Sequence, residues 1–394
     1  MICSFQFHFS DNKCESAEQI TVQHTVKKRK KGRKKERNAE DHTLIRFLLT
    51  SWILLQGCDS DVNCRNDDGN QVDWFVLYKL PNLRDGGLSY LYMDESTKGW
   101  RLSRETINSA SGALAYTLKP LLDFYDRKIE GFGYMLYSDQ PPKPYVAPSS
   151  FGHSKGVIML DRATGVWLSH STPQFPTYGS KDFWPKNGNA NAQTFMCVTY
   201  SYDEFKKIGL QLKFIHAYSY DSDIPTTFHN ELRCVAQRDC YPKTAPWFRE
   251  QILTSVNRRQ FHSFAKYRRF GDDLYSGIIV NNTKQDLYVK SWGKMRRPLP
   301  SNCTITHHVY NVKEMRLPDR NPFTDTVDHS KWCVTQDAGW ACIADMNREE
   351  SQMGRGGGAI CSTDVAFGQA FRGLIQQVEP CNVEGAFSDA HREL

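Results

Sequence analysis

The tripeptide His-Ser-Lys occurs twice in this chain, as His153-Ser154-Lys155 and as His329-Ser330-Lys331. Side chains two residues apart in a strand point to the same face, so each copy presents an imidazole and an ammonium together. Two such pairs around one centre suit phosphodiester chemistry. The lysines would bind the phosphate oxygens, one histidine would attack phosphorus, and the other would protonate the leaving oxygen. The sequence leaves open which histidine has which role.

Short strands must position both copies. The first copy leads into a predicted β-hairpin over residues 156–170, and the second into a hairpin of the same design over residues 332–345. Further strands are predicted over 72–79, 90–94, 131–137, 195–202 and 287–292, helices over 202–210, 248–256 and 367–378, and a flexible loop over 354–358.

The repeated hairpins predict a mixed α/β (α+β) fold with two similar halves, each with a β-sheet and flanking helices. Residues 59–225 would form the half with the first His-x-Lys, and residues 226–394 the half with the second. A chain of 394 residues with 40% hydrophobic content is long enough to bury a core of this size.

Residues 1–58 have the composition of a basic extension followed by a secretory signal. A basic run at 27–35 precedes an apolar stretch at 44–55, which is shorter than the ~20 residues of a spanning helix. The alternative is a nuclear protein whose basic run is a targeting signal. We favour secretion, with residues 1 to about 40 as an upstream extension.

The charge of the remaining chain is nearly balanced. Residues 1–58 hold 11 of the 50 Lys and Arg and 6 of the 44 Asp and Glu, which leaves 39 basic and 38 acidic residues. At acidic pH this body becomes positive, because histidines gain protons and carboxylates lose charge. That behaviour suits a polyanionic substrate in an acidic compartment.

The cysteines and glycosylation sequons also favour the secretory pathway. Nine cysteines follow the signal at spacings that do not match zinc sites, so we expect disulfides and no metal. Because nine is odd, at least one is free or paired between chains. Asn281 and Asn302 begin sequons for N-glycosylation.

Several longer phrases resemble the deoxyribonuclease II family, which belongs to the phospholipase D superfamily. The phrases are 72–81 (VDWFVLYKLP), 152–156 (GHSKG), 167–171 (WLSHS), 264–266 (FAK), 300–303 (PSNC), 328–333 (DHSKWC) and 356–358 (GGG) with Cys361. They span the whole body of the chain. Residues 224–229 and 304–312 favour the beta (DNase-like acid) branch.

The resemblance implies a pseudo-dimeric phospholipase-D-like fold and an acid endodeoxyribonuclease. Such an enzyme hydrolyses DNA to 3′-phosphate and 5′-hydroxyl ends without a cofactor or divalent metal, in lysosomes or secretions. Carried onto this sequence, the catalytic residues are His153, Lys155, His329 and Lys331. We expect DNA as the substrate, no stable membrane association, and a monomer or homodimer.

The sequence departs from the superfamily pattern after each lysine. That pattern leaves four residues between the lysine and an aspartate, whereas five separate Lys155 from Asp161 and Lys331 from Asp337. The candidates for supporting roles are Asp161, His170, Ser171 and Asn347. Ser171 lies 18 residues after His153 and Asn347 lies 18 after His329, so residue counting matches these two positions. The resemblance also implies the disulfides Cys64–Cys197, Cys303–Cys381 and Cys342–Cys361.

Two other functions are compatible with these residues. A phospholipase-D-type lipid phosphodiesterase would use the same chemistry on a different substrate. A catalytically inactive secreted nucleic-acid binder would keep the basic site without turnover.

Overall fold

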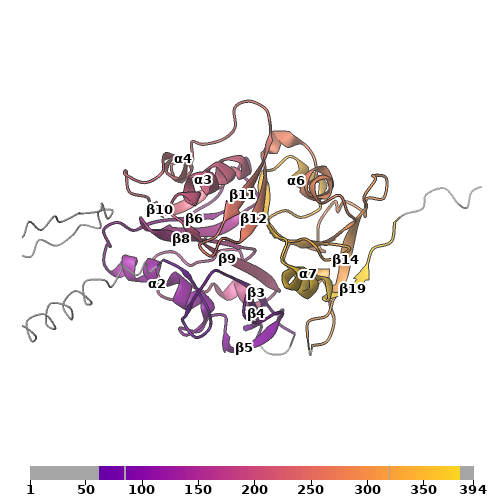
Figure 1. Ribbon diagram of the computed structural model, residues 1–394, viewed down its shortest axis with the longest axis horizontal. Coiled ribbons are helices and arrows are strands. Elements are labelled where there is room, and N and C mark those ends of the chain that lie inside the picture. The colour runs from indigo at the N-terminus through magenta and orange to yellow at the C-terminus, as the bar shows by residue number, and fades with distance from the viewer. Residues whose placement is uncertain (1–61, 84–85, 319, 382–394) are drawn as a thin grey trace, which may run out of the picture. The chain divides into compact units, whose positions relative to one another are not determined.

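The computed structural model describes residues 62–83, 86–318 and 320–381, which belong to one compact unit (Figure 1). Its helices and sheets form a mixed α/β structure, as predicted. The predicted basic extension and signal at residues 1–58 lie outside the described residues. Within the described part of the chain, no helix is long and apolar enough to span a membrane.

The first sheet contains the first His-x-Lys strand, β7, near its middle. Its strand order is β10-β6-β7-β8-β9-β3-β4-β5, and all of its pairings are antiparallel. In that order, the strands are Ser219–Asp223, Gly133–Ser138, Lys155–Leu160, Thr164–His170, Gln193–Ser201, Trp74–Lys79, Ser89–Asp94 and Arg101–Thr106. A separate short pair joins β1 (Cys64–Arg65) to β2 (Gln71–Val72).

The second sheet contains the second copy at β16. Its order is β11-β12-β18-β17-β16-β13-β14-β15, and β19 also pairs with β14. In that order, with β19 last, the strands are Phe248–Thr254, Gln260–Lys266, Gly357–Ser362, Ala341–Ala344, Trp332–Thr335, Leu287–Lys290, Val309–Met315, Phe323–Thr324 and Ile375–Val378.

Helices cover both sheets. In Figure 1, α2 (Ala113–Asp126) lies on the opposite side of the first sheet from α3 (Glu204–Ile215) and α4 (Asn230–Ala236). Apolar residues of both sheets, of α3 and of α7 (Val365–Arg372) share one buried cluster, so the two sheets pack through a common core. The remaining helices are α5 (Val280–Thr283), α6 (Glu350–Met353), a π-helix at Tyr275–Ile279, and short 3-10 turns at Lys186–Asn189, Arg268–Phe270 and Asp325–Val327.

The two sheets repeat one series of strand pairings. The series β6-β7-β8-β9-β3-β4 in the first sheet corresponds to β13-β16-β17-β18-β12-β11 in the second. Outside this series they differ, because β10 runs antiparallel to β6 whereas β14 runs parallel to β13. This repetition supports two similar halves. The phospholipase-D-like pseudo-dimer and the boundary at residues 225 and 226 stay predictions.

The predicted strands and both hairpins are present, but three other local predictions were wrong. Residues 248–254 form strand β11 and not a helix, because all seven pair with β12 and only Leu253 is buried. Gly357 and Gly358 begin buried strand β18 and do not belong to a loop. The predicted helix at 367–378 ends at Arg372, and the chain continues as β19.

The structure forms the three disulfides that the resemblance implied, Cys64–Cys197, Cys303–Cys381 and Cys342–Cys361. A fourth joins Cys234 to Cys240. Cys333 is the unpaired cysteine among the described residues and is buried. Burial raises the pKa of its thiol, so Cys333 is a poor nucleophile although it follows the second His-Ser-Lys closely.

Candidate active site

Each histidine of the repeated motif is held by the other half of the molecule. His153 immediately precedes β7, and its backbone N–H donates to the Gly356 carbonyl at 2.8 Å. His329 precedes β16, and its N–H donates to the Ala192 carbonyl at 2.9 Å. Gly356 lies before β18 and Ala192 before β9, which are corresponding strands of the two sheets. The two contacts are therefore reciprocal.

Two buried lysines hold the loops that supply these carbonyls. Lys79, at the end of β3, donates to the Asn189 carbonyl at 2.8 Å. Lys266, at the end of β12, donates to the carbonyls of Met353 and Arg355 at 2.8 Å each. Burial lowers the pKa of Lys266 to about 8. The lysines of the phrases YKLP and FAK thus have matching structural roles beside the site.

Close backbone contact around the His153 segment requires glycine at two positions. A Cβ atom on Gly152 or on Gly356 would collide with the carbonyl oxygen of Ile215. Larger residues would push apart the segments that carry His153 and its partner carbonyl. The GHSKG and GGG phrases are therefore steric requirements of the site.

Lys155 is neutralised within the protein. Its ammonium lies 2.6 Å from the Asp139 carboxylate, and both side chains are almost fully buried. Arg355, from the other half, lies 3.3 Å from the second oxygen of Asp139. Burial opposes ionisation of Asp139, but the charges of His153, Lys155 and Arg355 hold its pKa below its ordinary value.

Lys331 is buried without a partner of this kind. It is 4% exposed, and its ammonium forms no hydrogen bond or ion pair with another described residue. Burial, and then the positive charges of Lys155 and Lys290, lower its pKa to about 7. Unpaired buried charges are costly, so this ammonium is suited to an anionic ligand.

The two histidines have different charged neighbours. Burial lowers the pKa of His153, but the Asp139 carboxylate acts in the opposite direction and favours its protonated form. Burial, and then the charges of neighbouring lysines, including Lys331 and Lys155, lower the pKa of His329 to about 3. The amide nitrogen of Asn191 lies 3.5 Å from Nε2 of His329. Both pKa values are lowered, so the two histidines differ in their neighbouring charges: a carboxylate acts on His153, whereas the charges acting on His329 are those of lysines.

A serine and an aspartate occupy matching positions beside the two copies. Ser169 pairs with Gly156 and Ile343 with Trp332, so Ser171 and Asp345 correspond in register. The Ser171 hydroxyl accepts from the Thr194 N–H at 3.0 Å, and the Asp345 carboxylate accepts from the Gly358 N–H at 2.9 Å. The pattern is the same, but only the second half has a titratable group there.

Most of the chain matches a known protein family. The sequence profile described as Deoxyribonuclease II matches residues 63–381. The chain belongs to the deoxyribonuclease II family.

Curated relatives cover most of this chain and nearly all of their own length. Human deoxyribonuclease-2-beta is 37% identical over 86% of this chain and 98% of its own. Rat deoxyribonuclease-2-alpha is 40% identical over 81% and 95%. Plancitoxin-1 of Acanthaster planci is 36% identical over 85% and 96%. Alpha and beta members match at similar identity, so the beta assignment stays a prediction.

Of the supporting residues predicted for this member of the deoxyribonuclease II family, Asp161 does not lie with the four motif residues. It occupies the turn after β7, at the opposite end of that strand from Lys155, and accepts from the N–H groups of Ala163 and Thr164. An aspartate that caps a turn stabilises the hairpin and does not reach the motif histidines.

The other three supporting candidates lie near the site but do not bind its histidines directly. His170 is close enough for the charge of Lys155 to lower its pKa after burial, and its ring packs on Phe175 and Phe195. Asn347 accepts from the Trp292 N–H at 3.1 Å. The Trp292 ring contacts the His329 ring edge-on, with centroids 3.9 Å apart.

Sequence reasoning missed Asp139 and Asp345, and it did not predict the contact between Arg355 and Asp139. Asp139 immediately follows β6, the strand that pairs with β7. Ser138, the last residue of β6, is opposite Lys155, so Asp139 lies beside this lysine. An acidic residue immediately after a predicted strand was the available signal. Asp345 was missed because residue counting matched Asn347 to Ser171, whereas the second hairpin is shorter and moves the register. Arg355 was placed in a flexible loop.

One cluster of possible metal ligands occurs in the described ranges, at Cys303, His308 and Cys381. Its two cysteines form a disulfide, so their sulfur atoms are not thiolate ligands.

Asn281, the first sequon asparagine, is exposed at α5, and Asn302 is half-buried. Glycosylation at either stays a prediction.

Replacing Asp345 with Asn is expected to make stability less dependent on pH. Burial raises the pKa of Asp345 to about 7, compared with ~3.9 for an unfolded aspartate. The folded chain therefore binds more protons between these values, and the free energy of unfolding falls as pH rises. Urea unfolding gives the free energy of unfolding at pH 5 and at pH 8. We expect the difference between these two free energies to be smaller in Asp345→Asn than in the wild type, by more than ~1 kcal/mol.

The exposed Asp337, in the turn between β16 and β17, provides the control. Hydrogen bonds from Gln285 and Gly339 lower the pKa of its carboxyl, so it stays ionised at both pH values. Asp337→Asn should keep the wild-type difference. Equal pH dependence in wild type and Asp345→Asn would show that Asp345 does not carry this proton.

Proposed function

We propose that this protein is an acid endodeoxyribonuclease that hydrolyses DNA without a metal ion and leaves 3′-phosphate and 5′-hydroxyl ends. Membership of the deoxyribonuclease II family supports DNA as the substrate. The observation that carries the proposal is the buried, unpaired ammonium of Lys331, whose charge acts on both motif histidines. A DNA phosphate would supply the missing negative charge.

The reaction follows as two displacements at phosphorus. A neutral histidine nitrogen forms a bond to phosphorus, and the bond from phosphorus to the 5′-oxygen breaks as the protonated histidine donates its proton to that oxygen. Water then attacks phosphorus and gives its proton to the histidine that donated one in the first step. The phosphorus–nitrogen bond breaks, and the 3′-phosphate leaves. Lys155 and Lys331 stabilise the charge on the non-bridging oxygens.

We assign attack to His329 and proton donation to His153. His329 is surrounded by lysine charges that favour its neutral, nucleophilic form. His153 faces the Asp139 carboxylate, which favours a protonated ring. An incoming phosphate adds further negative charge and raises the proton affinity of both rings.

Acid activity has a physical basis in two of these groups. Below pH ~7 the Asp345 carboxyl is neutral and the Lys331 ammonium is charged, since each has a pKa of about 7. As pH rises, Asp345 gains negative charge and Lys331 loses its proton. Both changes make the pocket less positive and weaken phosphate binding.

Plasmid nicking tests the proposal most directly. We expect purified protein to nick supercoiled DNA at pH 5 with or without EDTA, and at least ~10-fold more slowly at pH 7.5. End-group analysis should find 3′-phosphate and 5′-hydroxyl ends. Loss of nicking in EDTA, or ends of the opposite type, would contradict the proposal.

A parallel assay with phosphatidylcholine vesicles distinguishes a lipid phosphodiesterase from a deoxyribonuclease, because only the lipid enzyme would release choline. DNA binding without nicking would instead indicate the inactive binder.

We also propose that the protein acts in lysosomes or secretions as a monomer or homodimer. Sequencing the N-terminus of secreted protein tests the signal, and light scattering tests the assembly.

A further inference from the structure

We propose that the loop at residues 291–300, between β13 and β14, is the element that holds the DNA backbone beside His329. This inference rests on the proposed function, since it concerns the same substrate at the same site. The loop has the sequence SWGKMRRPLP, and we call it the 291–300 loop.

The 291–300 loop has an excess of positive charge at the surface. Residues 287–313 contain no Asp or Glu. Lys294, Arg296 and Arg297 have exposed side chains. Arg297 lies 3.1 Å from Glu350, but both side chains are more than half exposed, so this ion pair costs little to exchange for a phosphate.

Trp292 and Lys294 place the first part of the loop next to the reacting centre. Trp292 belongs to the loop and contacts the His329 ring edge-on at 3.9 Å. The Lys294 ammonium lies 5.7 Å from the centre of the Trp292 ring, so this cation is held over the same aromatic side chain. A strand with one phosphate at His329 would bring its neighbouring phosphates to this loop.

The loop is fixed in place by backbone hydrogen bonds. Gly293 N–H donates to the Asp325 carbonyl at 3.0 Å, and Leu299 N–H donates to the Arg348 carbonyl at 2.9 Å. The backbone N–H of Trp292 donates to the side-chain oxygen of Asn347, which fixes a third point of the loop. An ordered loop loses little entropy when it binds, so its cations are prepared for a ligand.

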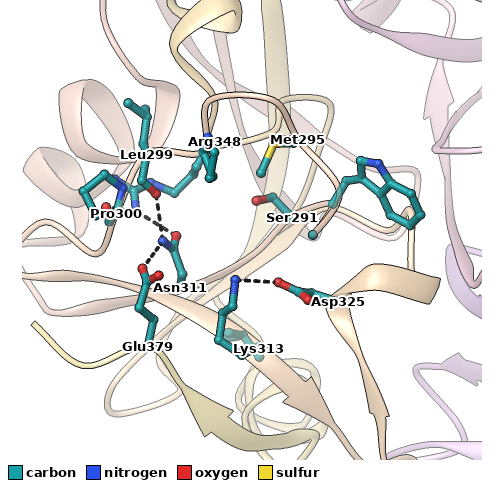
Figure 2. Close-up of a pocket in the computed structure, with 13 residues that line it drawn as sticks. Ser291, Met295, Leu299, Pro300, Asn311, Lys313, Asp325, Arg348 and Glu379 are labelled. Atoms are coloured by element: carbon teal, nitrogen blue, oxygen red, sulfur yellow. Dashed lines mark hydrogen bonds and ion pairs between the residues drawn. The ribbon is translucent and has the colours of Figure 1, made fainter.

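Residues of this loop line one side of a cavity of about 220 Å³, and Figure 2 shows the side chains around it. Its polar side chains are paired with one another and so are poor ligand contacts. Lys313 lies 2.8 Å from Asp325, and Asn311 bonds to Glu379 at 2.6 Å and to Arg348 at 2.7 Å. The exposed cations Lys294, Arg296 and Arg297 are therefore the ligand-binding face that we propose.

The composition favours DNA over an anionic membrane. Membrane-binding loops expose several large apolar side chains, but none of the exposed large hydrophobic residues among the described residues lies within 291–300. Three exposed cations with a partly buried tryptophan are typical of phosphate-backbone contacts.

The test compares two triple variants with equal loss of charge. Lys294→Gln/Arg296→Gln/Arg297→Gln removes the cations of the loop. Lys119→Gln/Arg127→Gln/Lys128→Gln removes three exposed cations at α2, outside the site, as the control. Binding is measured in a His153→Ala background with a fluorescein-labelled 20-base-pair duplex, at several salt concentrations and pH 5. Circular dichroism and thermal unfolding check that both variants fold.

We expect the loop variant to bind DNA roughly 10- to 100-fold more weakly at 0.1 M salt, and its plot of log affinity against log salt to be shallower by about 2 to 3. The control should keep the parent slope. A folded loop variant that keeps the parent slope would overturn the inference. Binding of the same variants to phosphatidylserine vesicles is also measured. A loop variant that no longer binds the vesicles but still binds DNA like the parent would overturn the inference as well. Absence of nicking by wild type would count against the proposed function alone, because binding is scored separately.

Discussion

The His329→Ala protein is expected to lose DNA nicking at pH 5 by roughly 10⁴-fold or more, because it lacks the imidazole that we assign to form the bond to phosphorus. His329 is positioned by its N–H bond to Ala192, and its ring is held by Trp292 and Asn191. A single-turnover nicking assay measures the loss.

A substrate that needs no acid separates the two histidines. In DNA with a sulfur atom in place of the bridging 5′-oxygen, the thiolate leaves without a proton. The His153→Ala protein should therefore recover much of its rate on this substrate, whereas His329→Ala should not. Quenching in denaturant should trap the upstream DNA fragment on His153→Ala. The reverse pattern would exchange the roles assigned here.

His307→Ala is the control for loss of an imidazole. His307 lines a surface pocket with Gln285 and Asp337, outside the site. It should nick DNA at the wild-type rate. Full activity of His329→Ala under the same conditions would contradict the covalent mechanism altogether.

The Asp139→Ala protein is expected to lose ~3–5 kcal/mol of unfolding free energy, in addition to most of its activity. Asp139 is 6% exposed and contacts Lys155 from its own half and Arg355 from the other half. Removing it would leave two cations uncompensated beside Lys331. Lys155 would also lose the contact that fixes it toward the phosphate.

The pH dependence identifies the charge as the cause. The pKa of Asp139 is lower in the folded protein than its ordinary value, so its stabilisation is present above ~3.9 and is lost as pH falls below that value. The difference between wild type and Asp139→Ala should therefore persist at pH 5 and shrink below pH ~4. Urea unfolding at pH 3.5, 5 and 7 measures it.

An exposed ion pair provides the comparison. Asp123 pairs with Lys119 on α2, and both side chains are at least half exposed. Asp123→Ala should change the free energy of unfolding by no more than ~0.5 kcal/mol. A similarly small change in Asp139→Ala would show that the buried network does not hold the two halves.

Local sequence predicted the hairpins well and some other elements poorly. Both hairpins combine apolar runs with short turns, and these signals are contained within about fifteen residues. At 248–256 the apolar spacing matched a helix, but pairing of every residue of β11 with β12 satisfied the backbone as a strand. A partner strand that follows in the chain is not visible in the spacing of one segment.

The residue types of the site were determined by the sequence alone. The repeated His-Ser-Lys identified the four motif residues and the phosphodiester chemistry, and the longer phrases identified the family. The tertiary structure decided which charges are paired. Asp139 neutralises Lys155, Lys331 has no such partner, and Asp345 occupies the position that residue counting gave to Asn347. Spacing along the chain fixes which groups are present, but charge pairing depends on burial and on distances across two sheets.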